Sequence, residues 1–189
     1  MIGLPPGSIL QSLFLVERIK CFSREGKTNF VEIGSGNGYV SNLFLKRGFT
    51  GVGFDLNKSA CENNKKLNEK FIEQGVYHVQ NIDFLSFELN KKYDIIISCM
   101  VIEHLPEDTL KLYINQCKKI LSDNGVIISI VPASMSYWGI EDEIAGHIKR
   151  YEFKDVHKLA ETHSFKIRKN VGLTFPMSNL LYKLSNYLI

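Results

Sequence analysis

Residues 93 to 100, YDIIISCM, limit the possible folds of this chain more than any other segment. The run is almost entirely apolar and contains three consecutive isoleucines, where a strand exposed on one face would alternate apolar with polar residues. Such a run is typical of a strand that is buried on both faces, as in a parallel sheet covered by helices. The segment therefore predicts the central strand of an α/β fold.

Strand-like and helix-like segments alternate along the whole chain. The other expected strands are 29–34, 49–55, 76–81, 126–131 and 165–173, and the expected helices are 9–21, 39–47, 58–70, 107–121 and 153–164. This alternation predicts a doubly wound, Rossmann-like, mostly parallel sheet in a three-layer αβα arrangement, with accessory helices at both ends. A chain of 189 residues suits a single domain, which we divide into 1–28, 29–131 and 132–189.

Charge and cysteine content limit the partners and the compartment that we expect for this protein. The net charge of +3 is spread along the chain, so we expect no nucleic-acid partner. The four cysteines form no C-x-x-C pair, and no cleavable leader is evident, so the cytoplasm is the expected compartment.

A doubly wound sheet binds its ligand at the carboxyl ends of its strands. The residues that follow the expected strands are therefore the first to consider for chemistry. They are Gly34 to Gly38, Asp55, Asn81 with Asp83, Cys99 to His104, and the segment from Pro132 onward. The turn GSGNG places glycines at 34, 36 and 38 but Tyr39 where a dinucleotide-binding turn has its third small residue, so its spacing departs from that pattern.

Five segments in order, VEIGSGNG, GVGFDLN, NIDFL, YDIIISCMVIEHL and LSDNGVIISIV, resemble the successive motifs of class I S-adenosylmethionine-dependent methyltransferases. The resemblance covers residues 29–131 and implies S-adenosylmethionine as cofactor. It assigns the methionine end of the cofactor to Glu32, Gly34, Ser35, Gly36 and Gly38. It assigns the ribose to Asp55, the adenine to Leu56 and Asp83, and the floor below the sulfonium to Cys99 and Met100; Asn81 joins this cofactor-binding set. On this interpretation 132–189 is the acceptor side.

Two histidines are the expected catalytic residues. Methyl transfer from a sulfonium is an in-line displacement, so alignment does most of the work and a base is needed only to deprotonate a hydroxyl acceptor. His104 in VIEHL and His147 in GHIKRY both follow strands on the expected ligand side. Either can instead play a structural role. The second segment resembles G-H-x-R-R-Y of small-substrate and sugar-type members, with Lys149 in place of the first arginine, which implies a lid or acceptor wall and an anionic acceptor group near Lys149 or Arg150. The expected acceptor is a small molecule or sugar, methylated on oxygen.

A metal is not expected. Some ubiquinone-pathway and small-RNA methyltransferases carry E-V-I-E-H, whose two glutamates and histidine bind a divalent ion. This chain has Met100 in place of the first glutamate, so Glu103 and His104 hold an ion poorly unless His147 or another group completes the site.

The C-terminal segment departs from the usual plan of the resembling family. Residues 175–189 show apolar residues at helical spacing where a seventh strand is usual, so both the presence and the absence of that strand stay open. The segment predicts a docked helix, with contact to a membrane surface, a dimer contact or a truncated end as alternatives; monomer and homodimer both stay open. Two other functions also remain: a non-catalytic S-adenosylmethionine-binding protein and an NAD-linked oxidoreductase. The latter is disfavoured because no tyrosine is followed four residues later by lysine.

Overall fold

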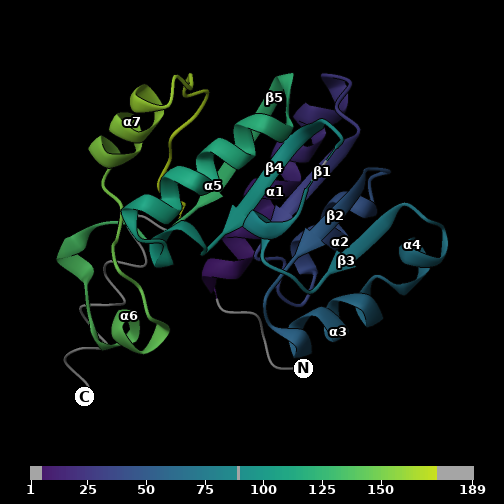
Figure 1. Ribbon diagram of the computed structural model, residues 1–189, viewed down its shortest axis with the longest axis horizontal. Helices are drawn as coiled ribbons and strands as arrows, with labels where there is room; N and C mark the ends of the chain where they lie inside the picture. Colours follow the sequence, from purple (N-terminus) through teal and green to yellow (C-terminus); the bar gives the residue numbers. More distant parts are fainter. Residues whose placement is uncertain (1–5, 89, 174–189) are drawn as a thin grey trace.

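A parallel sheet with the strand order β3-β2-β1-β4-β5 forms the centre of the computed structural model, which describes residues 6–88 and 90–173 (Figure 1). The strands are β1 (Asn29–Ile33), β2 (Thr50–Phe54), β3 (Tyr77–Gln80), β4 (Tyr93–Cys99) and β5 (Leu121–Ile130). All four strand pairs are parallel. The order changes direction between β1 and β4, which is the position where open α/β sheets bind ligands.

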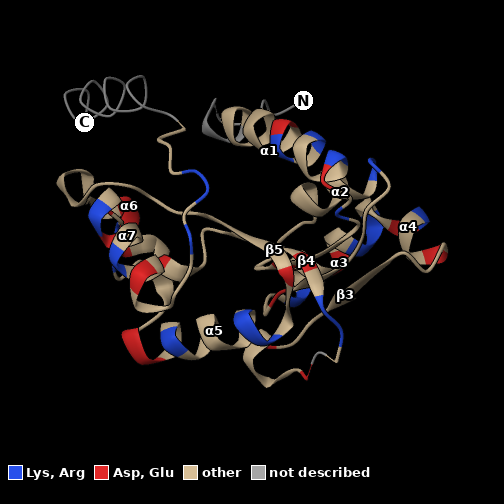
Figure 2. Cartoon of the chain, turned by 90° about the horizontal axis from the view of Figure 1, so that it is seen from above, with Lys and Arg blue, Asp and Glu red and all other residues tan. Residues whose placement is uncertain are grey.

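Helices cover both faces of the sheet, as the alternation predicts. They are α1 (Pro6–Arg24), α2 (Tyr39–Leu45), α3 (Lys58–Leu67), α4 (Glu69–Glu73), α5 (Glu107–Ile120), α6 (Ile140–Ala145) and α7 (Phe153–Thr162), with 3-10 turns η1 (Phe84–Ser86), η2 (Ile102–His104) and η3 (Met135–Tyr137). Figure 2 shows α1 and α2 on one face and α5 on the other. In Figure 1, α3 and α4 lie toward β3, whereas α6 and α7 lie toward β5.

The core consists of two apolar clusters, one on each face of the sheet. Neighbouring residues of β4 belong to different clusters, because Ile95 and Ile97 face α1 and α2 while Ile96 faces α5. All three are fully buried. The three-layer α/β fold predicted from the isoleucine run is therefore confirmed, and the sheet is parallel throughout the described residues.

The expected sixth strand at 165–173 is wrong. These residues form no strand; instead the Phe165 N–H donates to the Ala160 carbonyl at 2.8 Å and ends α7, and Arg168 pairs with Glu25 at 3.0 Å. Alternating apolar residues gave the segment strand character, but a strand also needs a neighbour to pair with, and here the contacts lead to α7 and the end of α1 instead.

Strand β5 begins at Leu121, five residues before the strand expected at 126–131. The register advances from Tyr93 opposite Leu121 to Ile95 opposite Val126, so three extra residues of β5 bulge out of the pairing. Among the described residues, no helix has the length and apolar character needed to cross a membrane. The C-terminal segment 175–189, with its expected helix, lies outside the described residues.

Candidate active site

The glycine turn links the carboxyl ends of β1 and β2. The N–H groups of Gly34 and Ser35 both donate to the Phe54 carbonyl at 2.9 Å. Gly34, Gly36 and Gly38 have φ values of 71°, 49° and 81°, which lie in the left-handed region that residues with a Cβ rarely adopt. The backbone conformation alone therefore accounts for glycine at all three positions.

The three glycines face different neighbours. A Cβ on Gly34 would lie 2.5 Å from a methyl group of Val101, and one on Gly38 would collide with the side-chain amides of Asn64 and Asn68. A Cβ on Gly36 would meet nothing within 4 Å. The protein's own side chains thus fill the space at two of the glycines, and Gly36 is the one that leaves room for a ligand.

Asp55 faces the open side of the turn. Its Oδ2 accepts from the Gly36 N–H at 2.7 Å and its Oδ1 from the Asn57 N–H at 2.8 Å. Each carboxylate oxygen can accept a further hydrogen bond, so two adjacent hydroxyls can bind to an acid that the backbone already orients. Leu56, the next residue, is 73% exposed and offers an apolar surface beside that acid.

The residues after β3 lie beside Asp55 but act differently from each other. Asn81 donates to the carbonyls of Asp55 and Leu56 at 2.9 and 3.0 Å, so its amide fixes the backbone that follows β2. Asp83 accepts from the Leu85 N–H at 3.0 Å and begins η1. Both side chains are exposed.

Glu32 and Ser35 lie beneath the turn. They are only 2% and 4% exposed, and Glu32 accepts a short hydrogen bond from the Ser41 hydroxyl of α2. Burial raises the pKa of Glu32 to about 8 despite that bond. In this structure, therefore, the Glu32 carboxyl contacts the protein rather than an open surface, and its predicted contact with the methionine end stays a prediction.

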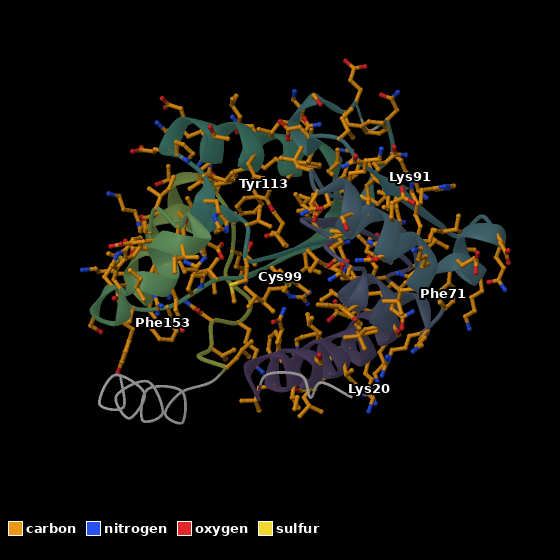
Figure 3. All side chains as sticks on the ribbon, turned by 90° about the horizontal axis from the view of Figure 1, so that it is seen from below. Lys20, Phe71, Lys91, Cys99, Tyr113 and Phe153 are labelled. Atoms are coloured by element: carbon orange, nitrogen blue, oxygen red, sulfur yellow. The ribbon has the colours of Figure 1, made fainter. Side chains whose placement is uncertain are left out.

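Cys99 and Met100 end β4 at the switch point. Figure 3 shows Cys99 near the middle of the molecule, whereas Phe153 of α7 lies at its edge. Burial raises the pKa of the Cys99 thiol to about 12, with Glu32 adding to the effect, so this thiol is neutral. Met100 is 47% exposed and has a φ of 55°, an unusual conformation for a residue with a side chain. Such strain is found disproportionately at functional sites.

The two predicted catalytic histidines lie together. The rings of His104 and His147 have centroids 4.8 Å apart and meet edge to face. His104 Nδ1 lies 3.0 Å from the Gly146 carbonyl, and His147 Nδ1 lies 2.8 Å from Asp142 Oδ1. Because both partners are acceptors, the geometry assigns the Nδ1–H tautomer to each ring, and in that tautomer Nε2 carries the lone pair.

Glu103 lies beside this pair. Its carboxyl is fully buried, and neither oxygen meets hydrogen-bond geometry with a described group. His147 Nε2 is 4.0 Å from Glu103 Oε1. Burial raises the pKa of Glu103, and the backbone N–H groups of Glu103 and Val101, together with the two histidines, only partly offset that rise. A buried acid without well-formed hydrogen bonds is costly unless a proton, an ion or a ligand meets it.

Asp142 anchors the acceptor side of the site. It is 1% exposed and accepts from His147, from Arg150 Nε at 2.8 Å and from the Gly139 N–H at 2.9 Å. Burial alone would raise the pKa of Asp142, but the hydrogen bonds from Arg150 and His147 hold it well below its usual range. Asp142 is therefore ionised and fixes the ring of His147.

The side chains of Glu103, His104 and His147 form a possible metal site. One ligand atom from each lies within 4.8 Å of the others. An oxygen and two imidazole nitrogens suit divalent transition metals, and both rings have the hydrogen-bonded Nδ1 that metal-binding histidines usually show. His147 thus supplies the third donor on which the sequence argument for a metal depends.

Comparison with known proteins decides the family. Residues 11–170 match the methyltransferase domain family. This chain belongs to that family.

Individual relatives agree with the assignment. A ubiquinone biosynthesis O-methyltransferase of Rickettsia bellii is 22% identical over 194 residues, which cover 92% of this chain and 76% of that protein. Magnesium protoporphyrin IX methyltransferase from Synechocystis PCC 6803, solved with bound S-adenosylhomocysteine, superposes with a TM-score of 0.68 at 15% identity, covering 85% of this chain and 75% of that one. The N-methyltransferase NodS from Bradyrhizobium japonicum, with the same ligand, has a TM-score of 0.67 at 16% identity over 82% and 74%. The family and the fold predicted from the motifs are confirmed, and the S-adenosylhomocysteine bound in both of these solved proteins agrees with the predicted cofactor.

Sequence reasoning missed two residues of this methyltransferase's site. Glu103 was considered only as part of an incomplete metal motif, and Asp142 was not considered at all. Asp142 reaches His147 because Gly146 has a φ of 73° and turns the chain back after α6, which no local pattern reveals. The one available signal was Asp142 itself, an acid inside an otherwise unexplained EDE run before a glycine and a histidine.

Proposed function

We propose that this chain transfers a methyl group from S-adenosylmethionine to a hydroxyl oxygen of a small molecule. The observation that carries the proposal is the histidine pair after β4: both rings are held through Nδ1, and both present Nε2 at the edge of the sheet where the methyl donor is expected. The match to the methyltransferase domain family supports this function over the two alternatives, an NAD-linked oxidoreductase and a non-catalytic binding protein.

On the donor side, Asp55 binds the two ribose hydroxyls through its two oxygens. The open face of Gly36 lets the main chain approach the amino-acid end of the cofactor, and Leu56 packs against the adenine. Asp83 and Asn81 border the adenine, and Cys99 with Met100 lies below the sulfonium. This assignment is supported by the hydrogen bonds that orient Asp55 and by the open space at Gly36.

On the acceptor side, His147 is the better candidate for the base. Its ring is fixed by Asp142, whose negative charge stabilises the imidazolium that forms when Nε2 takes the proton from the acceptor hydroxyl. His104 is fixed only by a neutral carbonyl, so it is better suited to orient the acceptor.

A divalent ion is the second candidate for handling that proton. Glu103, His104 and His147 fit such an ion by donor type, and the two unpartnered oxygens of Glu103 favour it. A bound ion would lower the pKa of a coordinated hydroxyl and so make an added base unnecessary. The chain's own part is to hold the donors, with Asp142 and the Gly146 carbonyl fixing the two rings.

The acceptor carries an apolar part. Three isoleucines of the segment around α6 are strongly exposed, Ile140 by 69%, Ile144 by 81% and Ile148 by 55%. The nearby cations are already paired, Arg150 with Asp142 and Lys149 with Asp155 at 3.2 Å. An apolar hydroxylated compound therefore fits better than an anionic sugar, and the similarity to a ubiquinone biosynthesis O-methyltransferase favours the same class.

Two measurements test the proposal. Calorimetric titration of the protein should show binding of S-adenosylhomocysteine and none of NAD. A screen of alkyl-substituted phenols and of monosaccharides, read out by release of S-adenosylhomocysteine, should give turnover with the phenols. Binding of NAD alone would overturn the proposed donor.

The histidine variants separate the two ways of handling the proton. If His147 is the base, His147→Ala lowers kcat by about 10² to 10⁴ whether or not EDTA is present. If a bound ion lowers the pKa of the acceptor hydroxyl, EDTA abolishes turnover of the wild type. Mn²⁺ binding measured by calorimetry is then lost in Glu103→Gln but kept in Glu107→Gln, a control at an exposed position. Unchanged turnover in His104→Ala and His147→Ala, together with no effect of EDTA, would remove both.

A further inference from the structure

Buried polar side chains form a continuous hydrogen-bonded chain beneath the glycine turn. Tyr77 of β3, Ser41 of α2 and Asn64 of α3 are all fully buried. The Tyr77 hydroxyl donates to Ser41 Oγ at 2.8 Å, and Ser41 in turn donates to Glu32. Asn64 Nδ2 donates to the same Tyr77 oxygen at 3.2 Å, so Tyr77 is the junction between the strand and the helix that follows β2.

The other end of this chain holds the turn itself. Asn64 Nδ2 also lies 3.1 Å from Ser35 Oγ, and Asn68 Nδ2 donates to the Gly38 carbonyl at 3.2 Å. Asn68 is held from both sides, because its Nδ2 also donates to Asn64 Oδ1 at 2.9 Å and its Oδ1 accepts from Asn42 at 2.8 Å. The two amides also occupy the space that a side chain at Gly38 would need.

These polar groups fix the glycine turn in addition to filling space in the core. Apolar side chains of similar size would fill the same space without requiring every amide and hydroxyl to find a partner. Here the hydrogen bonds end on the Ser35 hydroxyl and the Gly38 carbonyl, which flank Gly36. A turn with three glycines has many accessible conformations, so fixing it before the ligand arrives removes an entropic cost from binding.

We propose that Tyr77, Asn64 and Asn68 are positioning residues for the methyl donor, because they hold the segment from Ser35 to Gly38 so that the open side of Gly36, and Asp55 to which its N–H donates, stay accessible to the cofactor. The inference rests on the proposed use of this edge by S-adenosylmethionine. None of the three residues needs to touch the cofactor.

Tyr77→Phe is the cleanest test, since it removes one hydroxyl and keeps the buried ring that stacks on Phe30. Calorimetry should show S-adenosylhomocysteine binding weakened about fivefold or more, because a lost buried hydrogen bond is worth about 1 kcal/mol. Asn64→Ala should weaken binding further. The acceptor KM should stay unchanged in Tyr77→Phe, because the network does not reach the histidine pair.

Matched controls separate positioning from stability. Tyr93→Phe removes a hydroxyl from another buried strand tyrosine, which lies at the start of β4 and so away from the ligand edge. Asn115→Ala removes an exposed amide from α5. Both should bind S-adenosylhomocysteine as the wild type does. If Tyr77→Phe binds it within twofold of Tyr93→Phe, the inference is wrong, even if its melting temperature falls. If the wild type itself does not bind S-adenosylhomocysteine, the proposed function fails instead.

Discussion

The two sides of the ligand edge treat their buried polar groups in opposite ways. On the donor side, Asn64, Asn68 and Tyr77 are fully buried and each has hydrogen-bond partners within the protein. On the acceptor side, Glu103 is just as buried, but neither of its oxygens meets hydrogen-bond geometry with a described group, and His147 Nε2 lies 4.0 Å from Oε1. These donor-side residues are therefore hydrogen-bonded without a ligand, whereas the acceptor side holds a buried acid that a proton, an ion or a ligand would satisfy.

The backbone differs in the same way. On the donor side, the left-handed positions in the turn are glycines, which adopt that conformation without strain. Two residues with side chains adopt it outside the turn, Met100 below the expected sulfonium and Ser134 on the acceptor side, at φ values of 55° and 61°. The glycine turn therefore keeps its conformation without backbone strain, whereas strained positions lie below the expected sulfonium and on the acceptor side.

The largest expected effect is on donor binding. Asp55→Ala should weaken S-adenosylhomocysteine binding about 100-fold or more, because two hydrogen bonds to a charged acceptor are lost. Calorimetry measures this, with the exposed acid in Asp123→Ala as control. Unchanged affinity in Asp55→Ala would break the assignment of the donor side.

The next effect compares two glycines of one turn. Gly38→Ala should lower the free energy of unfolding by about 2 to 3 kcal/mol, since its methyl group collides with the amides of Asn64 and Asn68. Gly36→Ala should cost only about 1 kcal/mol, for its backbone conformation, yet weaken cofactor binding because its open side is filled. Urea unfolding and calorimetry distinguish the two, and equal costs would contradict the different surroundings.

Glu103→Gln tests the cost of the buried acid on the acceptor side through protein stability. In EDTA-treated protein at pH 7 it should raise the free energy of unfolding by about 1 to 2 kcal/mol, because the desolvation cost of a buried acid is removed.

The pH dependence has a defined sign. The folded-state pKa of Glu103 is raised above 4.5, so its proton stays bound in the folded state after the unfolded chain has lost it, and wild-type stability falls as the pH rises above about 4.5. Thermal melts from pH 4.5 to 8 should show a weaker fall in Glu103→Gln, with Glu107→Gln as control. A destabilised Glu103→Gln under these conditions would mean that the carboxylate has a partner in the folded protein.

The smallest effect concerns the exposed pair of Lys149 with Asp155. Lys149→Ala should change the free energy of unfolding by less than about 0.5 kcal/mol and leave the acceptor KM within twofold. Steady-state kinetics with an accepted substrate measures the acceptor KM. A tenfold rise in KM would indicate an anionic acceptor and restore the original expectation for this lysine.

Local patterns placed Gly36, Asp55 and Asn81 at the carboxyl edge of the sheet. Each comes just after a strand, so finding the strand also places the residue at that edge. The prediction of a sixth strand at 165–173 failed because alternating residues do not reveal whether a neighbouring strand is available for pairing. Asp142 escaped detection because its contact with His147 depends on the left-handed turn at Gly146.

The sequence by itself determined the layered parallel fold, the family and the order of motifs, because all of these depend on periodicity and on short spacings along the chain. Only the tertiary structure decided that the protein's own side chains occupy the space beside two of the three glycines. It also decided that Glu103, His104 and His147 lie together. Those contacts join residues up to 67 positions apart, as between Gly34 and Val101, and crossover connections, rather than local preference, set which distant side chains share a space.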